Sequence, residues 1–261
     1  MTDLPPCRSL GSHCLALSVV LHVADLEDDT PAERDALATW LTGHTERLTF
    51  GRPFLEGGAL LVDAVIQVPC KYLADGDGPG RTDEPSGRCA AHGFTGPLPD
   101  VPPLNSNGTF RHPGRDRFMV VHGGKRRVVE LAPKPLPLRS LRVIATDNPC
   151  LGAPCRTADN MQGAACCRDL TIDVVLEGGQ PGLLKLLRSR RSPYLCKVTP
   201  DGNGVAECEV ISACGYLESD GVTCGLHDRA RPDGRPAKPF VCSQWPELGP
   251  GHMGHPGCRL V

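Results

Sequence analysis

Cysteine is the residue type through which this sequence could do chemistry. The chain of 261 residues contains 14 cysteines, and nine of them lie between residues 150 and 242 in a region rich in Gly and Pro, seven of them in loops and turns outside the hairpin at 193–210. Thiolates are soft ligands that suit zinc, iron and iron–sulfur clusters, so seven thiols in one region predict a metal site. The predicted metal ligands are Cys150, Cys155, Cys166, Cys167, Cys214, Cys224 and Cys242.

The adjacent pair Cys166 and Cys167 constrains the geometry of this site. Neighbouring side chains on a strand point to opposite faces, so both thiols bind the metal only if they occupy an irregular turn. Otherwise one of the two cysteines does not bind the metal and contacts a metal ligand instead. Seven thiols exceed the four ligands of a closed zinc site, which leaves room for a [4Fe–4S] cluster or for two metal ions. The number of thiols does not decide whether the bound metal is zinc, iron or an iron–sulfur cluster.

The compartment decides between metal ligands and disulfides. The N-terminal sequence MTDLPPCRSLGSHCLAL has no basic segment followed by a long apolar one, and no later stretch approaches eighteen uninterrupted apolar residues. We therefore expect a cytoplasmic protein. A reducing compartment disfavours structural disulfides and favours metal binding by clustered thiols. An export route not visible in the sequence would favour disulfides instead.

Composition and charge narrow the class of protein. The formal net charge is −2 and the pI is near 6.5, so the chain has no general attraction for nucleic acids or anionic membranes. We expect a metal ion as partner, and neither nucleic acid nor membrane. The sequence has 30 Gly, 26 Pro and only 4% aromatic residues, which indicates short elements joined by many loops. We predict a small, loop-rich, metal-stapled α+β fold.

The first hundred residues contain three recognisable elements. Residues 15–24 are apolar and β-branched, which predicts a buried strand. Asp29, Thr30 and Pro31 are typical of a helix start, and the helix is expected to run to about Leu41. Residues 54–68 predict a hairpin that turns at a Gly-Gly pair.

The second half repeats this order. Residues 170–177 predict a strand, residues 181–187 a short helix, and residues 193–210 a hairpin that turns at Asp-Gly-Asn-Gly. The sequence VPCKYLADGDG from Val68 then matches SACGYLESDG from Ser212, and CAAH matches CGLH. We infer a tandem duplication with a first copy at 1–100 and a second at 147–261. Residues 101–146 form a linker that contains a predicted hairpin and an extended Pro-rich segment.

The two copies differ in their potential ligands. The first copy keeps five candidate ligands but lacks the Cys-Cys pair and a terminal cysteine. It therefore holds either a reduced four-ligand site or no metal, and we treat it as a degenerate copy. Its candidate ligands are Cys7, Cys14, Cys70, Cys89 and His92.

The second copy resembles the family of YkgJ-like cysteine cluster proteins, which are described as zinc- or iron-chelating domains and begin with CxxCxxCC. The corresponding segments here start with Asn148-Pro149-Cys150 and end with Cys166-Cys167, although the spacings between the cysteines are longer. Later family motifs resemble Cys214-Gly-Tyr-Leu, Cys224-Gly-Leu-His, Arg235-Pro and Cys242-Ser-Gln-Trp-Pro. The resemblance covers about residues 147–247. It implies a domain that chelates zinc or iron.

These observations favour a metal-binding protein in which the metal is structural or stored. The alternative is an enzyme that uses an iron–sulfur cluster or an open zinc site. The sequence has no GxSxG, HExxH or P-loop motif, so its catalytic activity stays uncertain. A nucleic-acid module stapled by zinc is a third alternative, but the expected basic and aromatic surface is missing.

Three further residues are singled out. His227 is interpreted as a group that hydrogen-bonds to a metal ligand. Cys196 and Cys208 lie on the two arms of the second hairpin, where they form either a redox-sensitive pair or two packing thiols.

Overall fold

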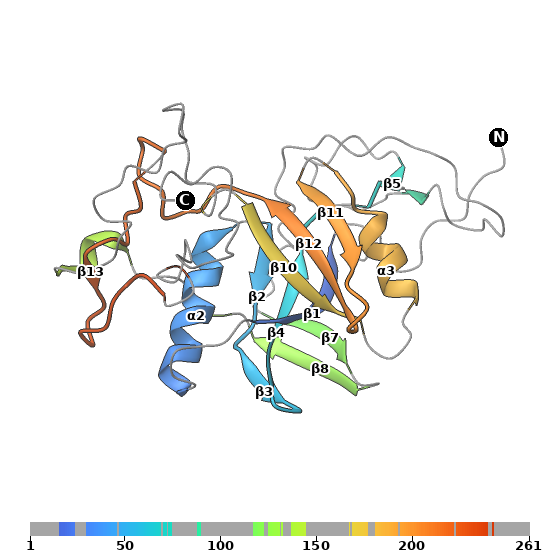
Figure 1. The fold of residues 1–261 in the computed structure, drawn as a ribbon, viewed down its shortest axis with the longest axis horizontal. Helices are drawn as coiled ribbons and strands as arrows, with labels where there is room; N and C mark the ends of the chain where they lie inside the picture. Colours follow the sequence, from blue (N-terminus) through green and yellow to red (C-terminus); the bar gives the residue numbers. More distant parts are fainter. Residues whose placement is uncertain are drawn as a thin grey trace, which may run out of the picture.

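The fold of the chain is α+β, with mostly strands and two α-helices in the part that the computed structural model describes (Figure 1). The residues described are 16–23, 30–45, 47–68, 70–71, 73–74, 88–89, 117–122, 125–130, 132, 137–144, 167, 169–176, 181–192, 194–221, 223–239 and 242.

An antiparallel sheet of seven strands runs through the centre of the molecule (Figure 1). Its order is β11 (Leu195–Pro200), β12 (Val205–Ile211), β10 (Asp169–Val175), β1 (Leu17–His22), β4 (Ala59–Ile66) and β2 (Leu48–Phe50), and β3 (Phe54–Glu56) also pairs with β4. β1 pairs with β10 at the centre, so strands from both predicted copies belong to one sheet.

Each half of the chain contributes a strand, a helix and a hairpin in the same order. In the first half these are β1, α2 (Pro31–His44) and the strands β2, β3 and β4; in the second they are β10, α3 (Pro181–Arg188) and the hairpin β11–β12. In each half the last strand lies between the first strand and the edge strand. The predicted strands, helices and hairpins are confirmed.

Helix α2 begins where the sequence predicted. The side chain of Thr30 caps the helix by accepting a hydrogen bond from the backbone N–H of Glu33 at 3.2 Å, and Pro31 follows it. The side chains of Leu37, Trp40 and Leu41 are buried, as their spacing predicted. The helix continues to His44, slightly beyond the predicted end.

One hydrophobic core joins the two halves. It contains Leu37 and Trp40 of α2, Leu187 of α3, and sheet residues from both halves such as Val19 and Val174. Burial of this apolar surface is the main force that holds the halves together.

The face of the sheet that points away from this core is covered in the first half only, as far as the structure describes the chain. The hairpin β7 (Arg117–His122) and β8 (Lys125–Glu130) lies against β1, and Val129 packs on Val20 and Leu61 (Figure 1). All but the first residue of β4 are therefore buried, whereas β12 alternates between buried and half-buried residues.

The remaining described segments are short. η1 (Leu138–Ser140) is a 3-10 turn inside the linker segment that we predicted to be extended, so that prediction was wrong for these residues. β9 (Arg142–Val143) pairs with β13 (Arg229–Ala230), and β5 (Leu73–Ala74) pairs with β6 (Arg88–Cys89). No helix in the described residues is long and apolar enough to span a membrane.

Candidate metal centre

Four of the seven predicted ligands lie in the described part of the chain. Cys214 is buried, and the other three, Cys167, Cys224 and Cys242, are half-buried. The predicted ligands Cys150, Cys155 and Cys166 lie outside the described residues.

Cys214 stands in a tight turn directly after β12. The backbone N–H of Leu217 donates to the carbonyl of Cys214 at 3.1 Å and closes the turn. The N–H of Tyr216 points at the sulfur of Cys214, with 3.5 Å between nitrogen and Sγ. The N–H of Cys214 itself donates to the carbonyl of Cys167 at 2.5 Å, so these two predicted ligands are neighbours although 46 residues separate them.

Cys224 belongs to a second turn that is hydrogen-bonded to the first. It forms a bridge with Leu217, and the N–H of Gly225 donates to the carbonyl of Tyr216 at 2.8 Å. The N–H of Cys242 donates to the carbonyl of Pro239 at 3.0 Å, so this cysteine also stands in a turn. Cys214, Cys224 and Cys242 therefore stand on turns, where the sequence placed them.

Tyr216 is buried in the same part of the core as these cysteines. Burial raises the pKa of its hydroxyl, and the nearby thiols of Cys214, Cys224 and Cys242 also raise this pKa. Cys224 and Cys242 pack against the core cluster that contains Cys214 and Tyr216. Cys167 also packs against the core cluster that contains Tyr216.

Within the described residues, no group of three or more His, Cys, Asp or Glu side chains is close enough to hold a metal ion. No disulfide joins any two of the cysteines that the structure describes. What the structure brings together is a set of four cysteines around Tyr216, which we call the Tyr216 cysteine group: Cys167, Cys214, Cys224 and Cys242.

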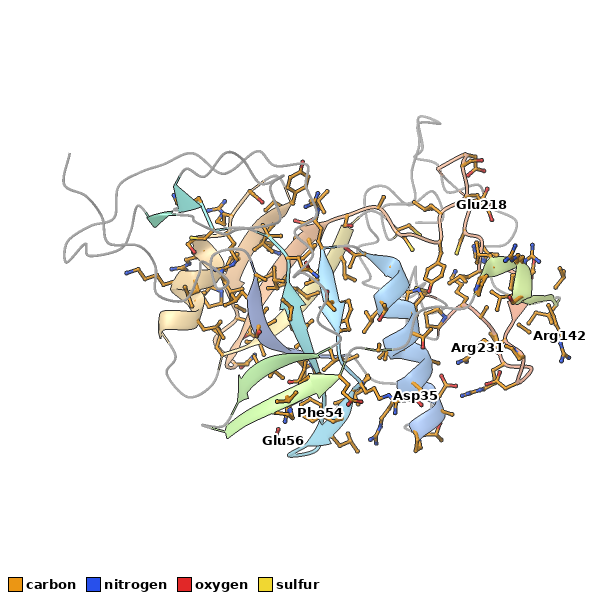
Figure 2. All side chains as sticks on the ribbon, turned by 180° about the vertical axis from the view of Figure 1, so that it is seen from behind. Asp35, Phe54, Glu56, Arg142, Glu218 and Arg231 are labelled. Carbon is orange, nitrogen blue, oxygen red and sulfur yellow. The ribbon has the colours of Figure 1, made fainter. Side chains whose placement is uncertain are left out.

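Helix α2 of the first half supports the Tyr216 cysteine group. The N–H of Gly215 donates to the carbonyl of His44, the last residue of α2, at 3.1 Å. The Tyr216 ring fills the place that a side chain at Gly43 would occupy, and its hydroxyl donates to the carbonyl of Thr39 at 3.4 Å. In Figure 2, Glu218, two residues after Tyr216, lies on the far side of α2 from the sheet.

The linker supports the group from another side. Leu138 packs so closely that a side chain at Gly225 would overlap it, and the N–H of Ile144 donates to the carbonyl of Asp228 at 2.6 Å. Arg142 and Arg231 lie together in this part of the molecule (Figure 2). Sequence reasoning missed these supports, because they come from segments that carry no metal-ligand motif.

His227 is half-buried at the end of the Cys224 turn, and its N–H donates to the carbonyl of Cys224 at 3.1 Å. Burial and, after it, the positive charge of Lys238 lower the pKa of its imidazole to about 4. The side chain is therefore neutral at neutral pH, as a metal-ligating histidine is.

We expect this histidine to make the metal-free protein acid-sensitive. Its pKa is lower in the folded chain than the ordinary 6.5, so between pH 6.5 and about 4 the unfolded chain binds more protons. The free energy of unfolding should fall as the pH drops through this window. Urea denaturation at several pH values measures the slope, and His227→Gln should reduce it. Equal slopes in the two proteins would contradict the prediction.

Cys196 and Cys208 do not face each other. Cys208 lies opposite Val198 in the hairpin, and it is fully buried. Burial and, after it, the negative charges of nearby Asp173 and Glu207 raise the pKa of its thiol to about 12. Cys196 stands at an irregularity of β11, and its sulfur lies 3.1 Å from the carboxylate of Glu209. Of the two predicted roles, a redox-sensitive pair or packing thiols, packing is the one that fits Cys208.

Comparisons with known proteins give no relative. No family model, no curated protein and no solved structure matches this chain.

Proposed function

We propose that the C-terminal half of the chain binds zinc or iron through Cys150, Cys155, Cys166, Cys167, Cys214, Cys224 and Cys242. The observation that carries this proposal is the gathering of four of these cysteines around Tyr216 from three separate stretches of sequence. A tetrahedral metal site needs donors from several directions, and turns on separate segments can supply them.

The chemistry of the donors supports a soft or borderline metal. All seven proposed ligands are cysteines, and sulfur is the donor that zinc, iron and iron–sulfur clusters share. A single zinc ion would use four of the thiols, and a [4Fe–4S] cluster would also use four. The bound metal would hold together a region that has few large apolar side chains, and structural zinc contributes on the order of 10 kcal/mol to folding.

We further propose that the fold arose by tandem duplication. When Cys70 is aligned with Cys214, Ile66 aligns with Val210, and both are fully buried. Ile66 pairs with Leu17 in β1, and Val210 pairs with Leu170 in β10.

The same alignment makes Leu17 of β1 the counterpart of Leu170 of β10, because each pairs with one of the two aligned residues. Four residues further along each strand, Leu21 is the counterpart of Val174. These two residues lie directly opposite each other where the halves meet. A residue that faces its own counterpart is what a two-fold relation between two copies requires.

The proposed cellular role is metal binding for structure or storage in the cytoplasm, as the resemblance to YkgJ-like cysteine cluster proteins implies. An iron–sulfur or zinc-dependent enzyme is the alternative. The fully thiolate donor set favours the first role, because it offers no general base and no obvious open coordination position.

Metal analysis of the full chain, purified without oxygen, tests the proposal. Zinc would give a colourless protein, whereas a cluster would give equimolar iron and sulfide with a broad absorption near about 400 nm. Replacement of both Cys166 and Cys167 by Ser should release metal and lower the melting temperature. Cys196→Ser, which changes a thiol outside the group, is the control. Unchanged metal content in the double variant would refute the assignment.

A further inference from the structure

We propose that the open face of the second half of the sheet binds a basic, extended segment of a partner protein. This open face is formed by β10, β12 and β11 on the side that points away from the core. Its acidic side chains include Asp173, Glu207 and Glu209, and Lys197 lies among them. The inference uses the alignment of the two halves and does not depend on the metal site.

The equivalent face of the first half shows what such a surface binds. There the hairpin β7–β8 covers the sheet, and Arg127 binds the buried carboxylate of Asp63 through two hydrogen bonds of 2.9 and 2.6 Å. Two residues further along β8, Val129 packs on Val20 and Leu61. The occupant of this face is thus an extended segment with a basic and an apolar residue two positions apart, which places both side chains on one side of the strand.

The alignment of the halves places matching residues on the open face. Glu207 is the counterpart of Asp63, and Val205 is the counterpart of Leu61. Val175 lies directly opposite Val205 and also packs against the apolar cluster beneath the hairpin. The open face therefore begins where the covered face ends, and a bound segment would continue the surface that the hairpin covers.

The chain neutralises the negative charge of the open face only in part. Asp173 and Glu207 lie directly opposite each other on neighbouring strands, a position in which like charges repel. Glu207 forms an exposed ion pair with Lys197, but within the described residues Asp173 forms no hydrogen bond and no ion pair. Burial and, after it, the charge of Glu207 raise the pKa of Asp173, whereas His22 on the neighbouring strand lowers this pKa. A cationic side chain between the two carboxylates would relieve the repulsion.

The chemistry of the partner follows from these neighbouring pairs. An apolar residue of the partner would contact Val175 and Val205, and an arginine two positions away would lie between Asp173 and Glu207. A guanidinium carries five N–H donors in a planar fork, so it can bind both carboxylates at once. The same spacing of a basic and an apolar residue occurs in β8, which covers the first half.

The probe for this surface is a fluorescent peptide with the sequence of residues 117–130, which contains the required spacing. Its anisotropy is measured during titration with the full chain, at low and at high salt. The variant Asp173→Asn/Glu207→Gln should bind the peptide about tenfold more weakly, because both carboxylates are lost. High salt should weaken binding to the unaltered chain. Equal affinity of the two proteins for the peptide would overturn the proposal.

A matched control separates the open face from a general effect of charge. Asp35→Asn/Glu218→Gln removes the same charge from α2 and from the far side of α2, and it should leave peptide binding unchanged (Figure 2). An equal loss of binding in this control would show that net charge alone attracts the peptide, and the proposal would be wrong.

A change in the peptide tests the contact without altering the fold of the chain. A peptide with Arg127→Gln should bind the unaltered chain more weakly, and it should lose little further affinity for the variant Asp173→Asn/Glu207→Gln. Independent, additive losses would contradict the proposed contact. Sedimentation of the chain alone tests the choice of partner. A dimer that the variant abolishes would overturn it, because the occupant would then be a second copy of this chain.

Discussion

Gly215→Ala should destabilise the chain by about 2 kcal/mol and weaken metal binding in the C-terminal half. A methyl group at this position would overlap the carbonyl oxygen of Gly43, which belongs to the backbone of α2. A backbone atom cannot move aside as a flexible side chain can, so either the helix or the Cys214 turn must shift. Because Gly215 follows Cys214 directly, the shift should displace a predicted ligand.

Two matched controls separate this clash from general effects of the substitution. Lys71→Ala changes the counterpart of Gly215 in the first half, where a side chain is already present, and should change stability by less than about 0.5 kcal/mol. Gly182→Ala adds a methyl group in α3 where nothing lies within 4 Å. It should be neutral or slightly stabilising, because Ala favours helix over Gly.

Urea denaturation and competition with a metal chelator measure the two effects of Gly215→Ala. We expect a lower denaturation midpoint without metal and a weaker metal affinity with it. If the denaturation midpoint falls while metal affinity stays the same, the Cys214 turn does not hold a ligand. If both are unchanged, α2 does not support the turn as closely as the structure indicates.

The local elements of this fold were predictable from sequence because each has a local cause. Thr30 and Pro31 set the start of α2 by capping and by a fixed backbone angle. Gly57 and Gly58 both adopt positive φ, which allows the tight hairpin between β3 and β4. Such signals lie within a few residues of the structure they determine.

The way the halves join was not predictable, because its causes are distant in sequence. The pairing of β1 with β10 depends on the complementary burial of Leu21 and Val174, which no local pattern reveals. β2 is only three residues long and is held by β4, so its sequence carries little strand signal. The candidate site divides in the same way, since ligand types were visible in the sequence but the supports from α2 and the linker were not.

Asp63→Ala should cost about 2 to 3 kcal/mol of unfolding free energy, because it breaks the ion pair that fixes the β7–β8 hairpin to the sheet. The Asp63 side chain is 4% exposed. Arg127 binds it through two hydrogen bonds, with Nε to Oδ2 at 2.9 Å and Nη2 to Oδ1 at 2.6 Å. The guanidinium of Arg127 also lies 4.2 Å from the ring centre of Phe54, which Figure 2 shows beside the hairpin.

The expected loss is smaller than for a fully buried pair, since the Arg127 side chain is 39% exposed and can reach water. The hairpin should still loosen, and Val20 and Leu61 should become more accessible. Hydrogen exchange of the β1 and β4 amides would detect this loosening alongside urea denaturation.

The second half provides a matched control for this prediction. Glu207 aligns with Asp63 and forms an ion pair with Lys197, but its side chain is 39% exposed. Glu207→Ala should therefore cost less than about 1 kcal/mol, as is usual for surface ion pairs. A double-mutant cycle of Asp63 with Arg127 should give a coupling of more than about 1 kcal/mol. A loss at position 63 as small as that at position 207 would mean that apolar contacts alone hold the hairpin, because the Asp63 carboxylate is buried whereas that of Glu207 is not.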